Sequence, residues 1–164
     1  LPAQYHAIPE RATVSRGELA ALVGVQLEGL LDEASVSEVT PIITDSRGHW
    51  ASQWILLLTR TRVMSVDAAY RFEPERLVNR GELSETVANV LDLLGSLDES
   101  ERDARARISD MSTQHLFYQS AVLAVDVGVL STYSDGAFRP AAEVSGAEAV
   151  DAVQLLRSLV SDLE

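Results

Sequence analysis

The chain has 164 residues, 46% of them hydrophobic, which suits one ordinary globular domain with a sizeable core. Its formal net charge of −12 at pH 7 argues against non-specific nucleic-acid binding, which needs a basic surface. The absence of cysteine excludes disulfides and thiolate metal sites, and apolar runs such as Trp54 to Leu58 are far too short to span a membrane.

Arginine supplies every basic side chain, because the chain contains no lysine. Any anion site must therefore be built from guanidinium groups, which bind carboxylates and phosphates in two contacts. A GC-rich genome would produce the same bias, and this is the simpler explanation. The chain begins with Leu1 and no signal-peptide pattern precedes the fold, so we expect a mature product or an excised piece.

The N-terminal part is predicted to hold one long helix. Residues 1–14 are expected to be irregular, since Pro2 and Pro9 limit helix formation. From about Ser15 to Leu31, leucine and valine recur at three- and four-residue steps, which predicts an amphipathic helix. A polar connection, Asp32 to Pro41, follows.

The middle of the chain predicts two further helices. The first covers about Gly48 to Thr61, with Asp45 as a cap or near-cap residue. The second runs from Asn79 to about Leu94 and ends at Gly95. Residues 96–107 are strongly charged and are interpreted as a solvated linker rather than a short surface helix.

The C-terminal part repeats this arrangement. A fourth helix is predicted over about His115 to Val127, and a turn follows at Asp135-Gly136. The last helix runs from Ser145 to about Val160.

One short motif opens three of these helices. It reads Ser15-Arg16-Gly17-Glu18, then Asn79-Arg80-Gly81-Glu82, and in altered form Ser145-Gly146-Ala147-Glu148. Ser or Asn three residues ahead of Glu is the capping-box pattern, in which each side chain accepts from the other's backbone N–H. The copies start 64 and 66 residues apart, so the chain is predicted to be a repeat protein.

The second and third repeat units align over most of their length. The matching pieces are Thr44-Asp45 with Ser109-Asp110, His49 with His115, Arg62-Val63-Met64 with Gly128-Val129-Leu130, and Phe72-Glu73-Pro74 with Phe138-Arg139-Pro140. The first unit is present only as its second half, from about Ile8-Pro9.

One helix pair cannot bury its apolar faces alone, so the units must pack on each other. We predict an all-α fold in a single domain, 1–164, made of units at about 1–34 (partial), 42–95 and 108–164. The helices from 15, 79 and 145 are expected to form the core, with the other two outside.

The second unit resembles the S-layer homology (SLH) domain. The residues that carry the resemblance are Thr44-Asp45, His49-Trp50-Ala51, Val63-Met64, Phe72-Glu73-Pro74 and Val78-Asn79-Arg80-Gly81-Glu82-Leu83. The family pattern has an opening Asp, a His-Trp-Ala helix, a Gly-Ile/Val step, Phe-x-Pro, and an Ile-Thr-Arg-Ala-Glu helix start. The third unit is a weaker copy. The resemblance implies a pseudo-three-fold bundle of helix–loop–helix units.

The resemblance also implies a function. SLH modules anchor exported proteins to the bacterial cell envelope, whether periplasm, outer membrane surface or cell wall. The implied ligand is a cell-wall or outer-membrane-associated glycan or peptidoglycan, held in grooves between units. The motif arginine is the principal anion contact, which corresponds to Arg16 and Arg80. Gly146 takes this position in the third motif, so that groove is expected to lack its main contact.

The position of these arginines has two interpretations. A cation in the first turn opposes the helix dipole, whereas free first-turn N–H groups favour an anion that an adjacent arginine can clamp. Alternatively, Glu18 and Glu82 neutralise Arg16 and Arg80 at the surface. Both interpretations stay open from sequence alone.

Asp45 and Trp50 complete the candidate glycan-binding set. Trp50 can stack on a sugar ring, but a helix Trp at apolar spacing is more commonly core, and the matching Leu116 favours core. Asp45 and Asp110 are interpreted as caps rather than catalysts.

No catalytic motif or metal-ligand spacing is recognised, so we expect no enzyme, metal or cofactor. The competing hypothesis is a degenerate SLH bundle that acts as a protein–protein scaffold in an exported protein, with a protein partner or an upstream fused domain.

Overall fold

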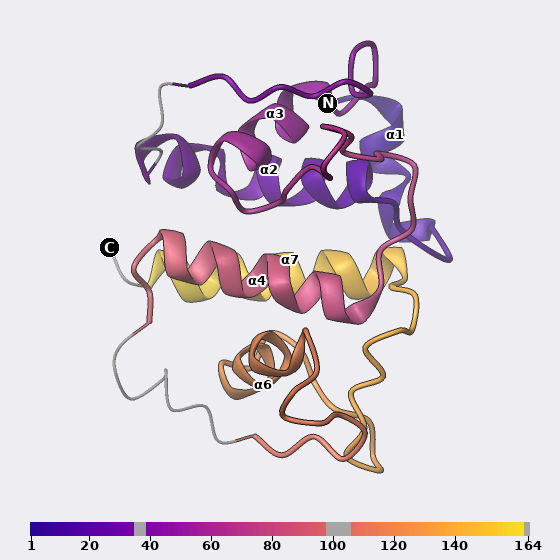
Figure 1. The fold of residues 1–164 in the computed structure, drawn as a ribbon, viewed down its shortest axis with the longest axis vertical. Helices are drawn as coiled ribbons and strands as arrows, with labels where there is room; N and C mark the ends of the chain where they lie inside the picture. Colours follow the sequence, from indigo (N-terminus) through magenta and orange to yellow (C-terminus); the bar gives the residue numbers. More distant parts are fainter. Residues whose placement is uncertain (35–38, 98–105, 163–164) are drawn as a thin grey trace.

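The computed structural model describes residues 1–34, 39–97 and 106–162, and in these ranges it is helical, without extended strands (Figure 1). The elements are α1 (Ala3–His6), the 3-10 helix η1 (Ile8–Glu10), α2 (Arg16–Ala34), α3 (Ser52–Arg60), α4 (Arg80–Leu93), α6 (Tyr118–Asp126) and α7 (Gly146–Ser161). None of the described helices is both long and apolar enough to cross a membrane.

The N-terminal segment differs from the prediction. Residues 1–14 contain α1 and η1 instead of irregular chain. Both prolines occupy helix starts: Pro2 is the N-cap of α1, and Pro9 lies in the first positions of η1. A proline costs little there, because the first N–H groups of a helix have no intrahelical partner.

The three long helices begin where the repeated motif predicts, because their caps are local. Asn79 accepts the N–H of Glu82 at 2.8 Å, and the Glu82 carboxylate accepts the N–H of Asn79 at 3.1 Å. Ser15 and Glu18 make the same exchange at 3.2 and 2.9 Å. At the third start, Ser145 accepts the N–H of Glu148 at 3.1 Å.

The two shorter helices start later than predicted. The expected ranges were 48–61 and 115–127, whereas α3 begins at Ser52 and α6 at Tyr118. The Nδ1 atom of His49 accepts the N–H of Ala51 at 3.1 Å, and His115 accepts that of Phe117 at 3.1 Å. These side-chain bonds form turns that precede the helices, and hydrophobic periodicity does not reveal them.

The ends of the helices follow backbone chemistry. Gly95 ends α4 as predicted, with φ 63°, and the next residue donates its N–H to Leu91 O at 3.0 Å. Of the predicted linker at 96–107, residues 98–105 lie outside the described residues.

The packing order places the short helices on the outer sides of the long ones. Helix α7 contacts both α2 and α4, while α3 packs on α2 and α6 packs on α4 (Figure 1). Gly24 in α2 allows α3 to pack closely, because an added Cβ would meet the Trp54 side chain of α3 at 2.5 Å.

Three buried valines join the starts of the long helices. The backbone N–H of Val14 donates to Val144 O at 2.9 Å, that of Val144 to Val78 O at 3.1 Å, and that of Val78 to Val14 O at 2.9 Å. Each valine is at most 1% exposed. The three bonds form a closed cycle. Each valine directly precedes an N-capping residue, Ser15, Asn79 or Ser145, so the cycle holds the three helix starts close together.

Candidate functional site

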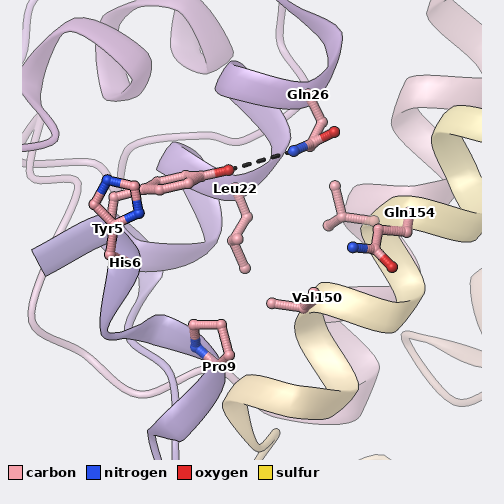
Figure 2. Close-up of a pocket in the computed structure, with 8 residues that line it drawn as sticks. Tyr5, His6, Pro9, Leu22, Gln26, Val150 and Gln154 are labelled. Carbon is pink, nitrogen blue, oxygen red and sulfur yellow. Dashed lines mark hydrogen bonds between the residues drawn. The ribbon is translucent and has the colours of Figure 1, made fainter. Parts of the chain in front are cut away.

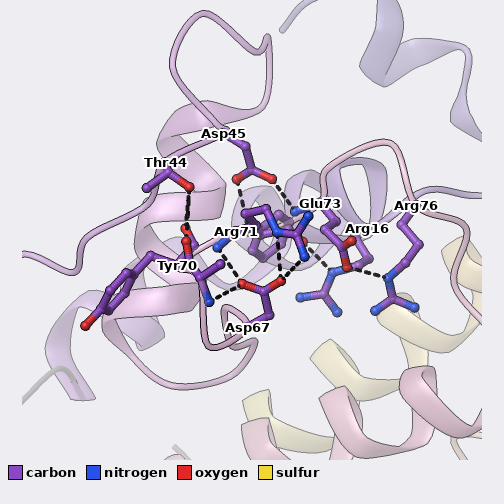
Figure 3. Close-up of polar contacts among 10 residues, drawn as sticks. Arg16, Thr44, Asp45, Asp67, Tyr70, Arg71, Glu73 and Arg76 are labelled. Carbon is purple, nitrogen blue, oxygen red and sulfur yellow. Dashed lines mark hydrogen bonds and ion pairs between the residues drawn. The ribbon is translucent and has the colours of Figure 1, made fainter.

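The Arg16 side chain is fixed by the backbone of the second unit. Its Nε donates to Phe72 O at 2.8 Å and its Nη2 to Ser65 O at 2.7 Å. Its Cζ lies 4.6 Å from the centroid of the Phe72 ring. These contacts hold the guanidinium in one orientation at the boundary between the first and second units (Figure 3).

The guanidinium faces a small groove, called the Arg16 groove below, of about 60 Å³. Its lining residues are Arg16, Leu19, Arg62, Val63, Met64, Ser65, Val78, Glu82, Glu85, Thr86 and Asn89. Arg16 forms no ion pair with any described carboxylate. Its neighbour Glu82 instead binds Arg76 at 2.6 Å, and Arg76 also pairs with Glu73 at 3.1 Å.

Arg80 has the same surroundings one unit later. Its Nε donates to Phe138 O at 2.8 Å, its Nη2 to Ser131 O at 2.6 Å, and its Cζ lies 4.6 Å from the Phe138 ring centroid. The difference lies at Nη1, which donates to the carboxylate of Glu148. Arg80 is only 5% exposed, so the pair is shielded from solvent.

Burial affects both guanidinium groups in the same direction. Removal from water lowers the pKa of Arg16, and the nearby charge of Arg76 adds to that effect. Burial likewise lowers the pKa of Arg80. Arginine starts from so high a pKa that both groups stay protonated at neutral pH.

The third helix start offers no cation. Gly146 has no side chain, and a Cβ built there would collide with the backbone carbonyl of Ile8. Ile8 is fully buried, as are Phe72 and Phe138 at the corresponding places of the later units. The N-terminal backbone therefore fills the space that an arginine needs at the third start.

Asp45 does not cap a helix, which corrects the sequence interpretation. Its carboxylate oxygens accept the N–H groups of Phe72 at 2.8 Å and Glu73 at 2.7 Å (Figure 3). Asp45 thus fixes the peptide group between Phe72 and Glu73, whose carbonyl accepts from Arg16. Each carboxylate oxygen of Asp45 accepts one of these backbone N–H groups.

Asp110 repeats the arrangement, with the N–H groups of Phe138 and Arg139 at 2.8 Å each. Desolvation alone would raise the pKa of Asp110, but these two hydrogen bonds, a third from its own backbone and the charge of Arg139 together outweigh it and lower the pKa below its usual value.

Trp50 lies outside the Arg16 groove. It is half-buried, with its ring centroid 5.7 Å from that of His49 and 6.2 Å from that of Trp54. Trp50 packs against the hydrophobic core, whereas the matching Leu116 is 82% exposed, so the match with Leu116 does not support a core position. The four predicted residues therefore do not form one site: Arg16 and Arg80 lie at separate unit boundaries, and Asp45 supports Phe72.

A second cavity of about 230 Å³ was not predicted, because α1 was not (Figure 2). It lies between the N-terminal segment, α2 and α7, with Tyr5, Leu22 and Val150 among its lining residues. The Tyr5 hydroxyl accepts from Gln26 Nε2 at 3.4 Å. Among the described residues, no group of three or more His, Asp or Glu side chains is placed to hold a metal ion.

The comparison with known families bears on the third unit. Residues 123–150 match the S-layer homology domain. The match covers the end of α6, the connection with Phe138 and the start of α7. It therefore includes Glu148 as well as Ser131 and Phe138, whose carbonyls accept from Arg80 and, with the Phe138 ring, form what is called the Arg80 cradle below. No curated protein matches the chain.

S-layer homology domains bind envelope polymers and anchor proteins to the bacterial cell envelope in general. The match is therefore consistent with an S-layer homology protein that is associated with the bacterial envelope.

Proposed function

We propose that the protein is a non-catalytic SLH module that binds an acidic glycan of the cell envelope and so anchors an exported protein. One observation carries this proposal: the Arg16 guanidinium is held rigidly by two backbone carbonyls, forms no ion pair with a described residue, and faces a groove. A fixed guanidinium binds a carboxylate at a lower entropic cost than a mobile one.

The proposal includes a pseudo-three-fold arrangement of the units. It is supported by the cyclic hydrogen bonds of Val14, Val78 and Val144 and by the matching backbone contacts of the Arg16 and Arg80 side chains. The packing of α3 on α2 and of α6 on α4 supports it as well.

The size of the groove limits what enters it. Its volume of about 60 Å³ is small beside the cavity of about 230 Å³ that Tyr5 and Leu22 line. A carboxylate fits, whereas a sugar ring has to lie at the rim. The ligand implied is a glycan with an acidic substituent that projects from the ring.

The test is retention of the purified protein on isolated cell-wall or outer-membrane glycan. Arg16→Gln should weaken retention by about 10- to 100-fold, since a hydrogen bond to a charged group contributes about 1.5–3 kcal/mol. The control is Arg71→Gln, because Arg71 is 56% exposed and pairs with Asp67 away from the groove. Equal retention of wild type and Arg16→Gln, with both folded, contradicts the assigned contact.

A protein–protein scaffold is the second candidate function. Its specific support is that Arg80 already has an internal carboxylate and that Gly146 supplies no cation. Two of the three unit boundaries therefore lack a free guanidinium. A stable stoichiometric complex with a protein fused or secreted alongside it, together with no glycan retention, favours this candidate.

A further inference from the structure

The two arginine cradles differ at one position outside the motif. Arg16 donates its backbone N–H to Arg76 O at 2.8 Å, and Arg80 donates its N–H to Ala142 O at 2.9 Å. Position 142 is therefore the structural counterpart of position 76. An arginine at 76 binds Glu82 at 2.6 Å, whereas the alanine at 142 has no side chain that can bind Glu148.

This difference decides where each motif glutamate goes. Glu82 stays in its capping box and pairs with Arg76. Glu148 lacks such a partner and pairs with Arg80 across the boundary between the second and third units. Its carboxylate sits where the acid of a ligand would have to bind Arg80.

Arg62 distinguishes the two cradles a second time. It lines the Arg16 groove, is exposed, and forms no ion pair with a described residue. Its backbone is left-handed, with φ 62°, and the third unit has Gly128 at this position with φ 78°. The left-handed region disfavours side chains other than glycine. The second unit thus keeps an arginine beside Arg16 where glycine fits the backbone better.

We propose that the molecule binds an acidic group in one groove only: Arg16 and Arg62 bind it together, and Glu148 is a built-in acid that occupies the Arg80 cradle. This inference rests on the proposed function and makes it more specific. The side chain at position 76 or 142 determines which arginine is free for a ligand, because it decides whether the motif glutamate pairs within its own unit or with the arginine of the preceding unit.

A carboxylate in the lining of the Arg16 groove limits the ligand further. Glu85 lines it and forms no ion pair with a described side chain, so it repels a second anionic group. A carboxylate accepts hydrogen bonds from hydroxyl groups. The ligand that suits both the arginines and Glu85 is a saccharide unit with a single carboxylate next to hydroxyl groups.

The test uses lactate, which carries one carboxylate beside one hydroxyl, and follows the arginine Nε–H signals by ¹⁵N NMR. Sodium chloride at equal ionic strength is the control for screening. In the wild type, the signal of Arg16 should shift with lactate and that of Arg80 should not. In Glu148→Gln and in Ala142→Arg, the Arg80 signal should respond as well.

Arg62→Gly tests the second cation without endangering the fold, since the third unit carries glycine there. It should weaken lactate binding at Arg16 by at least three-fold while the thermal midpoint does not fall. A response of Arg80 in the wild type, no response of Arg16, or unchanged affinity in Arg62→Gly would each overturn the inference.

The outcomes separate this inference from the proposed function. Lactate binding at Arg16 without glycan retention contradicts the proposed function and leaves the single-groove inference standing. Glycan retention with an equal lactate response at Arg80 contradicts the single-groove inference alone.

Discussion

The backbone carbonyl of Ile8 lies against the α-carbon of Gly146, so that the first residue of α7 has no room for a side chain. This contact joins the N-terminal segment to the last helix of the chain. It also explains why the third motif departs from the other two.

Gly146→Ala should therefore destabilise the fold. The new methyl group collides with backbone, which cannot move aside as a side chain can, and overpacking typically costs about 1–3 kcal/mol. Urea unfolding measures the loss. Gly29→Ala is the matched control, because Gly29 lies in α2 with nothing within 4 Å of an added Cβ. That control should gain up to about 1 kcal/mol from helix propensity. Equal effects of the two substitutions would show that Ile8 does not crowd Gly146.

Gly128 and Arg62 occupy the same repeat position, and substitutions there should change the stability of the fold in opposite directions. Gly128 has φ 78° and open space around it, so Gly128→Ala should cost about 1–2 kcal/mol through backbone strain alone. Arg62→Gly relieves a similar strain but adds entropy to the unfolded chain, for a net gain of about 0.5 kcal/mol. Thermal unfolding of both variants provides the measurement. Stability changes of the same sign would contradict the left-handed assignment of one of them.

Removal of the Asn79 side chain, which caps α4, should moderately lower the stability of the fold. Asn79→Ala removes the acceptor of the Glu82 N–H and should cost about 1 kcal/mol. Ser158→Ala serves as control, since this exposed serine lies inside α7 and alanine is the better helix former. The urea midpoint should fall for the first variant only. An unchanged midpoint in Asn79→Ala would mean that water replaces the cap without loss.

Asp110 predicts a loss of stability in acid. Its folded-state pKa lies below the ordinary value of 3.8, so the folded protein binds this proton less readily than the unfolded chain. The stabilisation is complete above about pH 4 and is lost as the pH falls through the folded-state pKa. Urea unfolding at a series of pH values should show a shallower acid decline in Asp110→Asn. Identical declines would exclude Asp110 as a contributor.

Local sequence rules account for the parts of the fold that depend on neighbours in sequence. The capping boxes at Ser15 and Asn79 form within four residues, and the pattern alone located α2 and α4. The segment with α1 could not be predicted in this way. The late starts of α3 and α6 depend on histidine side chains that bind backbone two residues on, which leaves no hydrophobic signature.

The candidate site likewise combines features that the sequence predicts with features that depend on distant residues. The motif identifies Arg16 and Arg80 as equivalent, but their difference arises from Glu148, which is 68 residues from Arg80 in sequence. The role of Asp45 depends on N–H groups 27 and 28 residues away. A contact between two units decides the first feature and a long-range contact within the second unit decides the second, and a local pattern contains neither.

The cycle of Val14, Val78 and Val144 sets a limit on copy number. Every valine in it both gives and receives a bond, so no amide or carbonyl is left over to admit a fourth repeat. A linear array can grow by duplication of a module, whereas this hydrogen-bonded cycle is complete with three valines. Loss of the segment around Val14 or of that around Val144 would leave a buried backbone group without its partner, so these two segments must come together before the cycle is complete.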